Sequence, residues 1–430
     1  MSPDAIRREA VDVAIVGGGP AGLAAATALA RGGAGRVVVL EREAEPGGIP
    51  RHARHQGFGL RDLHRAMSGP RYAARIAERA AGGGAELRTE VQVTDWDEDG
   101  ALELTGPTGR TTMTARAVIL ATGCRERSRS ARLVPGSRPQ GVMTTGMLQQ
   151  LVYLRGEVPG RRAVVVGAEH VSFSALVTLA HGGARAVAMI TEHPRHQSLA
   201  AIRGGAALRF RTPLHTRTRL AAIHGRPRVE AVELADLDTG RTSELACDLV
   251  IFTAVWIPDH ELAVLGEAVL DRATGGPSVD PALRTTRGGV FAAGNLLQGA
   301  ETADVAALSG SHVAAGVIRY LDGEPWPTAR TPIRCEAPLG WISPNALTAD
   351  PSHTLAPPRG RFLLRSGEAL SRAVVELSQD GRQLWRGRLR RIGPGRSTRI
   401  AADWTRGVDA LGGPVFARLL AARRPSGAPK

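Results

Sequence analysis

The sequence predicts an α/β fold with two Rossmann-like βαβ domains, the second inserted in the first, and a small C-terminal antiparallel β domain. A glycine-rich turn follows an apolar run near the N-terminus. The same pattern returns about 150 residues later, as an internal duplication does. The composition becomes rich in proline and arginine after residue 330. A chain of 430 residues is long enough for each of these domains to bury its own core.

The first pattern is an apolar β-run, Val11–Val16, followed by a glycine-rich turn and a helix-forming run, Leu23–Leu29. In a GxGxxG turn the first glycine permits a tight bend, the second lets backbone approach a pyrophosphate, and the third lets helix pack on strand. The helix N-terminus then offers free N–H groups and a positive dipole end to the phosphates. The residues of this candidate nucleotide site are Gly17, Gly19, Pro20, Ala21 and Gly22.

A second strand, Arg36–Leu40, ends at Glu41, and Arg42 follows. An acidic residue about twenty positions after the glycine-rich turn is part of the same fingerprint. We expect the Glu41 carboxylate to accept hydrogen bonds from ribose hydroxyls, with Arg42 beside it in the cofactor site.

The rest of the first domain alternates loops, a helix and short strands. Glycine, proline and charge make the stretch from Gly47 to His55 a loop, and three glycines close the helix that follows it. The predicted elements are a helix over Tyr72–Ala81, a meander near Glu86–Val93, Ala101–Leu104 and Thr111–Ala115, and a buried strand that runs from Ala117 into the turn Ala121, Thr122 and Gly123.

The duplicate repeats this order, with a strand at Arg162–Val166, a helix at Val171–Ala180 and a strand at Ala184–Ile190 that ends near Glu192. A meander over Thr216–Glu244 and a buried strand at Leu249–Thr253 follow, and then a strand–turn at Gly289–Asn295 and a helix over Asp304–Tyr320. We expect a first domain formed by residues 1–155 and 285–330, a second at 156–284 and a third at 331–430.

The third domain shows strands around Ala373–Leu377 and Gln383–Leu389. Asp380-Gly381 between them is a strong hairpin signal. Nothing in this region indicates chemistry.

Composition excludes several functions. The net charge is +14 at pH 7, but Lys430 is the only lysine and the arginines are scattered, so a basic face for an acidic protein is favoured over nucleic acid. The three cysteines, Cys124, Cys247 and Cys335, form no CxxC, which argues against a dithiol and against a metal or iron–sulfur site in this chain. No apolar run is long enough to span a membrane and the N-terminus lacks a signal-peptide pattern, so we expect a cytoplasmic protein.

Three segments together resemble the two-dinucleotide-domain flavoproteins of the pyridine nucleotide–disulfide oxidoreductase superfamily. They are the first glycine-rich turn with Glu41, the Ala121–Gly123 turn, and Phe291–Asn295. The resemblance implies that the first turn binds FAD, with Glu41 on the adenosine ribose. It places Gly294 and Asn295, where the family carries an aspartate, beside the ribityl chain and phosphates. It also implies that Gly48 lies near the cofactor and that a helix beginning near Thr302 and Ala303 points its N-terminus at the flavin ring.

Two departures from the family pattern limit the chemistry. No redox cysteines follow Gly47-Gly48; Pro50 and His55 stand in the corresponding places, so a dithiol relay is excluded. The duplicate turn keeps only Gly167, and Ala168, Glu169 and His170 follow it. Glu169 puts a carboxylate where phosphate charge would sit, which argues against NAD(P)H.

Further motifs narrow the resemblance to the FAD subunits of opine oxidase, hydrogen cyanide synthase and dye-linked proline dehydrogenase. They are Gly47–His52, Gly57–Arg61, Thr144–Gly146, and Ala293–Leu297 with Glu301–Ala303. The resemblance implies oxidation of a C–N bond in an amino-acid-like small molecule. It also implies two partners, a small iron–sulfur protein and a second flavoprotein subunit.

His52 and His55 lie in the loop that the resemblance brings near the flavin. A histidine there can take the amine proton as hydride leaves, because its pKa lies near neutrality. Both histidines are therefore candidate catalytic residues, although a hydrogen-bonding role in the loop is the alternative for each.

The leading hypothesis is an FAD-dependent oxidoreductase, a subunit of a dehydrogenase complex that oxidises an amine, amino-acid or opine-like substrate and passes electrons to a partner or another non-nicotinamide acceptor. One alternative is an NAD(P)H-dependent reductase of a ferredoxin-type partner, which the basic charge and Glu192 favour. Another is a non-catalytic nucleotide-binding scaffold subunit.

Overall fold

The computed structural model describes residues 7–198, 204, 208–299, 301–348 and 355–423. The chain forms two compact units. Unit 1 comprises residues 1–51, 56–124 and 258–425, and unit 2 comprises residues 52–55, 125–257 and 426–430. The chain leaves unit 1 at β9 (Cys124–Glu126) and returns to it at β18 (Trp256–Pro258), and these two strands pair with each other.

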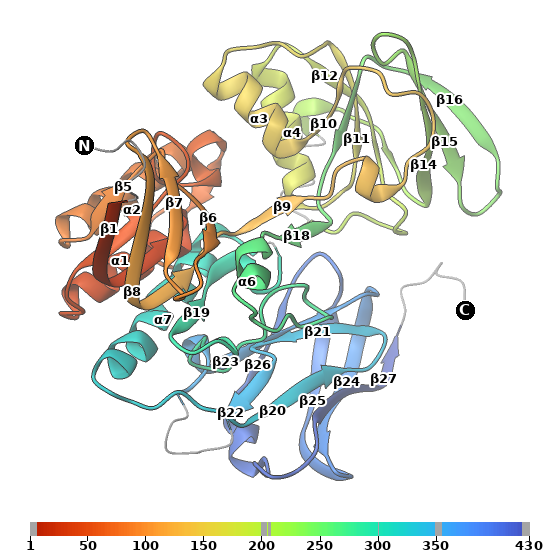
Figure 1. Ribbon diagram of the computed structural model, residues 1–430. Helices are drawn as coiled ribbons and strands as arrows, with labels where there is room; N and C mark the ends of the chain where they lie inside the picture. Colours follow the sequence, from red (N-terminus) through yellow and green to blue (C-terminus); the bar gives the residue numbers. More distant parts are fainter. Residues whose placement is uncertain (1–6, 199–203, 205–207, 300, 349–354, 424–430) are drawn as a thin grey trace. The chain divides into compact units, whose positions relative to one another are not determined.

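Unit 1 is built on a seven-stranded sheet with the order β5-β2-β1-β8-β7-β6, in which β19 also pairs with β8 (Figure 1). The pairs of β1 with β2 and β8, of β2 with β5, and of β8 with β19 are parallel. The strands are β1 (Arg7–Val16), β2 (Val37–Leu40), β5 (Glu86–Arg88), β6 (Gln92–Trp96), β7 (Leu102–Gly106), β8 (Gly109–Leu120) and β19 (Val290–Ala292). Their parallel order is that of an α/β nucleotide-binding fold.

Strand β8 corrects one expectation, because a single 12-residue strand replaces the separate strands predicted at 111–115 and 117–120. Its first half pairs antiparallel with β7 and its second half lies between β1 and β19 in parallel register. The change of partners explains the sequence pattern. The first part of the strand is mostly polar and partly exposed, whereas its last four residues, 117–120, are apolar and buried.

Three helices of unit 1 pack together: α1 (Pro20–Arg31) contacts both α2 (Gly69–Gly82) and α7 (Ala303–Leu321). The contact between α1 and α7 is close, since a Cβ on Gly310 would lie 1.9 Å from the Ala21 carbonyl oxygen. Shorter elements of unit 1 are η1 (Ile49–His52, whose last residue belongs to unit 2), β3 (Gln56–Phe58), β4 (Met67–Ser68), α6 (Glu261–Leu265) and η3 (Gly294–Leu296).

Unit 2 contains a five-stranded parallel sheet, β10-β17-β11-β12-β13, and a three-stranded antiparallel meander, β14-β15-β16. Helices α3 (Thr145–Leu154) and α4 (His170–His181) pack on each other. The remaining elements are η2 (Ser130–Arg132), β10 (Val142–Thr144), β11 (Arg162–Val166), β12 (Arg185–Ile190), β13 (Leu214–His215), β14 (Thr218–His224), β15 (Ala231–Asp236), β16 (Thr242–Ala246) and β17 (Leu249–Phe252).

The C-terminal region belongs to unit 1 and forms two sheets, β22-β20-β27-β24-β25 and β21-β23-β26, around its own core. Its pairs are antiparallel except that of β20 with β27. Asp380 and Gly381, both at positive φ, join β24 to β25, as the hairpin signal predicts. The elements are β20 (Arg330–Cys335), β21 (Leu339–Ser343), β22 (Ala346–Thr348), η5 (Pro358–Gly360), β23 (Arg361–Ser366), β24 (Leu370–Gln379), β25 (Arg382–Ile392), β26 (Thr398–Ala401), η6 (Asp403–Gly407) and β27 (Val415–Arg423).

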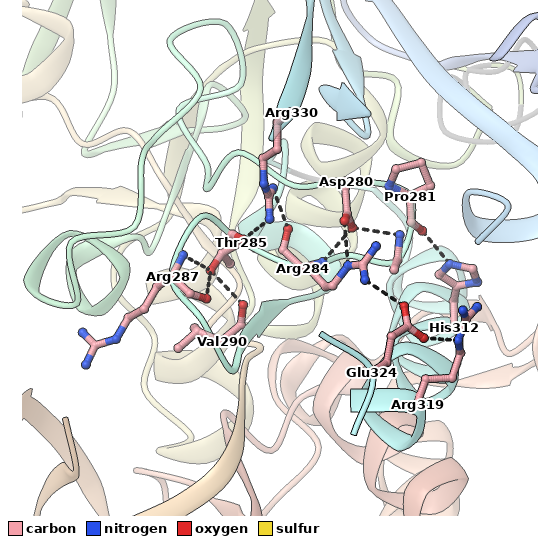
Figure 2. Close-up of polar contacts among 11 residues, drawn as sticks. Asp280, Pro281, Arg284, Thr285, Arg287, Val290, His312, Arg319, Glu324 and Arg330 are labelled. Atoms are coloured by element: carbon pink, nitrogen blue, oxygen red, sulfur yellow. Dashed lines mark hydrogen bonds and ion pairs between the residues drawn. The ribbon is translucent and has the colours of Figure 1, made fainter. Parts of the chain in front are cut away.

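A buried polar network joins the C-terminal region to the rest of unit 1 (Figure 2). Asp280, which is fully buried, accepts a hydrogen bond from Arg284 Nε at 2.7 Å, and Arg284 Nη1 lies 3.1 Å from Glu324. At the start of β20, Arg330 donates to the carbonyl oxygens of Arg284 and Thr285. The network therefore fixes β20 against the segment that leads into β19.

Among the residues described, no helix is long and apolar enough to cross a membrane.

Candidate functional site

The glycine-rich turn of unit 1 has the backbone form that the fingerprint requires. Gly17 has φ +108°, and a Cβ on it would lie 2.5 Å from the Ala121 carbonyl oxygen. A Cβ on Gly22 would lie 1.9 Å from the carbonyl oxygen of Gly17. A side chain is thus excluded at both positions, and the strand, the turn and helix α1 pack as one unit.

The middle glycine is different, since a Cβ on Gly19 would meet no described atom within 4 Å. Gly19 is the N-cap of α1, Pro20 is in the first helical turn, and no side chain of the described residues caps this helix end. The first-turn N–H groups, among them those of Ala21 and Gly22, are thus open to a ligand. This is a cradle that the pyrophosphate of FAD fits.

Glu41 lies at the end of β2 with its side chain buried. Its carboxylate accepts hydrogen bonds from the N–H groups of Gly18 (2.9 Å) and Glu43 (2.8 Å). Burial raises the pKa of Glu41, and the two N–H donors oppose that shift. Glu41 therefore holds the turn in place, and its contact with a ribose stays a prediction. Arg42 is exposed beside it.

The loop after β2 lies against the glycine-rich turn. The N–H of Gly47 donates to the carbonyl oxygen of Gly18 at 2.7 Å, and a Cβ on Gly48 would approach the Gly19 Cα to 3.0 Å. Arg51 is occupied by ion pairs with Glu43 and, at 3.2 Å, with Glu45. Gly48 is thus next to the cradle, and its contact with the cofactor stays a prediction.

The other two predicted segments, the Ala121–Gly123 turn and the segment that contains Gly294, also lie against the glycine-rich turn and the start of α1. The N–H of Ala121 bonds to Val16, and Thr122 Oγ1 donates to the carbonyl oxygen of Asp259 at 2.7 Å. Gly123 follows in a positive-φ conformation of +81°. Gly294 has φ +74°, and a Cβ on it would lie 2.6 Å from the Ala21 Cβ. The structure therefore gathers all three segments around the first turn of α1.

Asn295 closes the loop that precedes α7. Its Oδ1 accepts the N–H of Glu301 at 2.9 Å and its Nδ2 donates to the carbonyl oxygen of Glu301 at 3.2 Å. The amide that stands in place of the family's aspartate thus forms hydrogen bonds to the backbone of its own loop. Its contact with a ribityl chain stays a prediction.

The helix predicted near Thr302 and Ala303 begins there, with Thr302 as N-cap and Ala303 as first residue of α7. Asp304 in its first turn is buried and lies 3.0 Å from the Arg61 guanidinium. Glu301 lies 2.9 Å from Arg365 of strand β23. Sequence reasoning missed both ion pairs, because nothing in the local patterns links residues so far apart in the chain.

His52 and His55, the candidate catalytic residues, group with unit 2. The side chain of His52 is fully buried, and that of His55 is half-buried. Within unit 2, the Arg54 guanidinium lies over the Tyr153 ring at 5.1 Å and donates to the Tyr153 carbonyl oxygen. The catalytic role of the two histidines stays a prediction.

The duplicate turn in unit 2 is filled by one of its own side chains. Glu169 Oε2 accepts the N–H of Ala168 at 3.0 Å, and Oε1 accepts the hydroxyl of Ser172 at 2.6 Å and that of Thr253. Glu169 is also the N-cap of α4. A carboxylate thus occupies the anion position at the helix N-terminus, where a dinucleotide phosphate would bind.

A loop lies over this closed turn, since the N–H of Gln197 donates to the Ala168 carbonyl oxygen at 2.9 Å. Glu192, predicted at a ribose position, is exposed. Nearby, Glu126 accepts the N–H of Gly146 at 2.8 Å at the start of α3. Burial raises the pKa of Glu126 to about 7, and the neighbouring charge of Glu169 adds to the shift. No sequence signal marked Glu126.

The chain belongs to the pyridine nucleotide–disulphide oxidoreductase family, whose model matches residues 11–310. It is therefore an FAD-dependent oxidoreductase with the α/β nucleotide-binding fold of that family, and the cradle around Gly19 fits the cofactor.

Relatives of the chain are named for several different activities. A thioredoxin reductase of Treponema pallidum is 30% identical over 321 residues, which cover 72% of this chain and 97% of that protein. One subunit of the opine oxidase of Rhizobium meliloti is 32% identical over 36% of this chain and 33% of its own length. The alpha subunit of the sarcosine oxidase of a Corynebacterium species is 32% identical over 47% of this chain and 21% of its own length.

The thioredoxin reductase of T. acidophilum has the same fold, with a TM-score of 0.61 and 24% identity over 72% of this chain and 98% of that one. Paired cysteines of the CxxC type do not occur in the present chain.

Proposed function

We propose that this chain is the FAD-binding subunit of a dehydrogenase complex that oxidises an amine, amino-acid or opine-like substrate. Electrons pass to a partner protein or to another acceptor that is not a nicotinamide. The observation that carries the proposal is the second dinucleotide turn, which Glu169 fills in place of a phosphate. The absence of a CxxC pair from the sequence leaves no dithiol of that type as the electron route.

Two of the relatives support the substrate class. Opine oxidase and sarcosine oxidase are named for substrates that contain a secondary amine beside a carboxylate. Both relatives are subunits by name, which supports a multi-subunit complex here. The partners we propose are a small iron–sulfur protein and a second flavoprotein subunit.

The chemistry requires that a substrate carbon lose a hydride and its nitrogen lose a proton, which leaves a C=N bond that water can hydrolyse. FAD, when bound, supplies the two-electron acceptor. Gly17, Gly19 and Gly22 would hold its pyrophosphate, and Glu41 its adenosine ribose. His55 is the base we propose for the amine proton, with His52 as its neighbour in the same loop.

Anaerobic titration of the purified holoprotein tests the proposal. We expect an amine from a panel of amino acids, N-methyl amino acids and opines to bleach the flavin absorbance, whereas NADH and NADPH leave it unchanged. Rapid bleaching by NADPH with turnover by the isolated chain would favour the nicotinamide-dependent reductase instead. A flavin that no donor reduces, even with the partner subunits present, would favour the scaffold role.

His55→Ala tests the proposed base on its own. We expect slower flavin reduction by the substrate with full FAD content. Unchanged reduction kinetics would remove His55 from the mechanism.

A further inference from the structure

The sheet β21-β23-β26 of the C-terminal region has one face in the core and one face lined with arginine. Phe362 and Leu364 of β23 are fully buried in the C-terminal core, so the alternate residues Arg361 and Arg365 lie on the opposite face. Strand β26 pairs with β23 so that Arg399 stands opposite Leu363, on this same face. We call Arg359, Arg361 and Arg399 the arginine face; Arg359 lies in η5, just before β23.

The arginine face is anchored at the N-terminal end of α7. Arg365 Nη2 lies 2.9 Å from Glu301 Oε1, and Ser397, two residues before Arg399, donates to the same carboxylate. The Arg365 guanidinium also lies 4.8 Å from the centre of the Trp341 ring. Element η5 packs against α7 as well. The position of the arginine face relative to α7 is therefore set by several contacts within unit 1.

The loop that precedes α7 connects the arginine face to the cofactor cradle. Gly294, at its start, packs against Ala21 in the first turn of α1, and Glu301, near its end, holds Arg365 and Ser397. A small molecule bound beside the cofactor would thus border the C-terminal sheet.

Around the arginine face, positive side chains outnumber negative ones. Arg365 is paired with Glu301 and Arg61 with Asp304, which uses both carboxylates. In the part of the chain that the structure describes, the three residues of the arginine face are exposed and make no ion pair. Partial burial lowers the pKa of Arg399, the charges of Arg359, Arg61 and Arg361 add to the shift, and the charge of Glu301 opposes it.

We propose that the arginine face binds the carboxylate of the substrate, with Arg399 as its main ligand; this rests on the proposed amine dehydrogenase function. A planar guanidinium with several parallel N–H donors matches a carboxylate, and the positive end of α7 adds to the attraction. The substrate class narrows accordingly to amines that carry a carboxylate, such as N-substituted amino acids. Arg365 and Glu301 are positioning residues that hold the face in place.

Binding of pyrrole-2-carboxylate to the holoprotein, measured by titration calorimetry, tests this. The probe places a secondary N–H next to a carboxylate and cannot be dehydrogenated. We expect it to bind at least about tenfold tighter than pyrrole-2-carboxamide, as charge-assisted hydrogen bonds imply. Arg399→Gln should weaken carboxylate binding by a similar factor and leave carboxamide binding unchanged.

Arg388→Gln is the matched control, because Arg388 is also exposed and lies on strand β25 of the other sheet, opposite Val374. No binding by the wild type, equal binding of the two probes, or equal weakening by both variants would overturn the proposal. Carboxylate binding that depends on Arg399, without flavin reduction by any amine, would retain the site and reject the function. Flavin reduction by an amine, with a KM that Arg399→Gln leaves unchanged, would retain the function and reject the site. Thermal unfolding of both variants confirms that they fold.

Discussion

Single residues decide which of the two dinucleotide turns is open. Both turns follow a parallel strand and begin a helix, but one presents the empty space beside Gly19 and the other the carboxylate of Glu169. Spacing in the sequence identified both turns. The contacts of the Glu169 side chain with Ala168 and Thr253 could not be predicted from local sequence, because Thr253 is distant in the chain.

Gly19→Val should remove FAD and leave the protein folded. The new side chain would enter the space proposed for the pyrophosphate, and Gly19 has a φ of −80°, which valine also adopts. The ratio of flavin absorbance to protein absorbance measures this. Gly22→Val is the contrasting variant, since its Cβ would meet the carbonyl oxygen of Gly17 and should impair folding itself. Full FAD content in Gly19→Val would place the pyrophosphate elsewhere.

Glu169→Gly should give unit 2 a measurable affinity for NADH, at least about tenfold above that of the wild type, because removal of a close like charge is worth more than one kcal/mol in a partly buried site. Fluorescence of bound NADH reports the change. Ser172→Ala is the control: it loses both hydrogen bonds of the Ser172 hydroxyl with Glu169, one to the carboxylate and one from the backbone N–H, but keeps the carboxylate, so it should not bind NADH. Equal binding by both variants would mean that the carboxylate does not close the turn.

Glu126 predicts a pH dependence. Its folded pKa of about 7 is above the ordinary value of 4.5, so the stability it contributes is complete below pH 4.5 and is lost as the pH rises through 7. The loss should amount to about 1–3 kcal/mol between pH 5 and pH 8. Denaturant unfolding at several pH values measures it, and in Glu126→Gln this part of the pH dependence should disappear. A wild type and variant with parallel pH profiles would contradict the assignment.

Elements were predictable where one pattern held throughout. Strand β11 was predicted with its observed bounds, and the helix expected at 304–320 is α7. Strand β8 was not recognised as continuous, because its composition changes from mostly polar to apolar within the strand, where β19 replaces β7 as its second partner. Secondary structure follows local pattern, whereas strand partners are set by the whole sheet.

The network of Figure 2 acts at the scale of elements, since it links the segment before β19 to the start of β20 and to Glu324, which follows α7. Arg284→Met should destabilise unit 1 by about 3–5 kcal/mol, because the buried carboxylate of Asp280 loses its partner. Arg319→Met removes a more exposed partner of the same Glu324 and should cost less than about 1 kcal/mol. Denaturant unfolding compares them; equal losses would mean that burial does not govern the network.

The whole molecule combines one unit with an open nucleotide turn and one with a closed turn. FAD should therefore stabilise unit 1 only, since a ligand stabilises the state that binds it. In calorimetry of the apoprotein, added FAD should raise the transition of unit 1 and leave that of unit 2 in place. Gly19→Val should show no such shift. A joint rise of both transitions would mean that the units unfold together.

At this scale the form of the candidate cofactor turn was predictable from the sequence, whereas the arginine face was not. The glycine positions follow from a fingerprint that is contiguous in sequence. Arg399 is one arginine among many in the C-terminal region, and it became distinct only when β26 paired with β23 and Ser397 reached Glu301. Residues that meet through tertiary pairing carry no local signal.

The carboxylate that closes the second turn has a metabolic consequence. An anion built into the chain is present at a fixed local concentration, whatever the nucleotide pool contains. For the proposed dehydrogenase, the ratio of NADH to NAD⁺ in the cell then has no direct influence on turnover. Oxidation of the substrate would respond only to its own supply and to how fast the partner removes electrons.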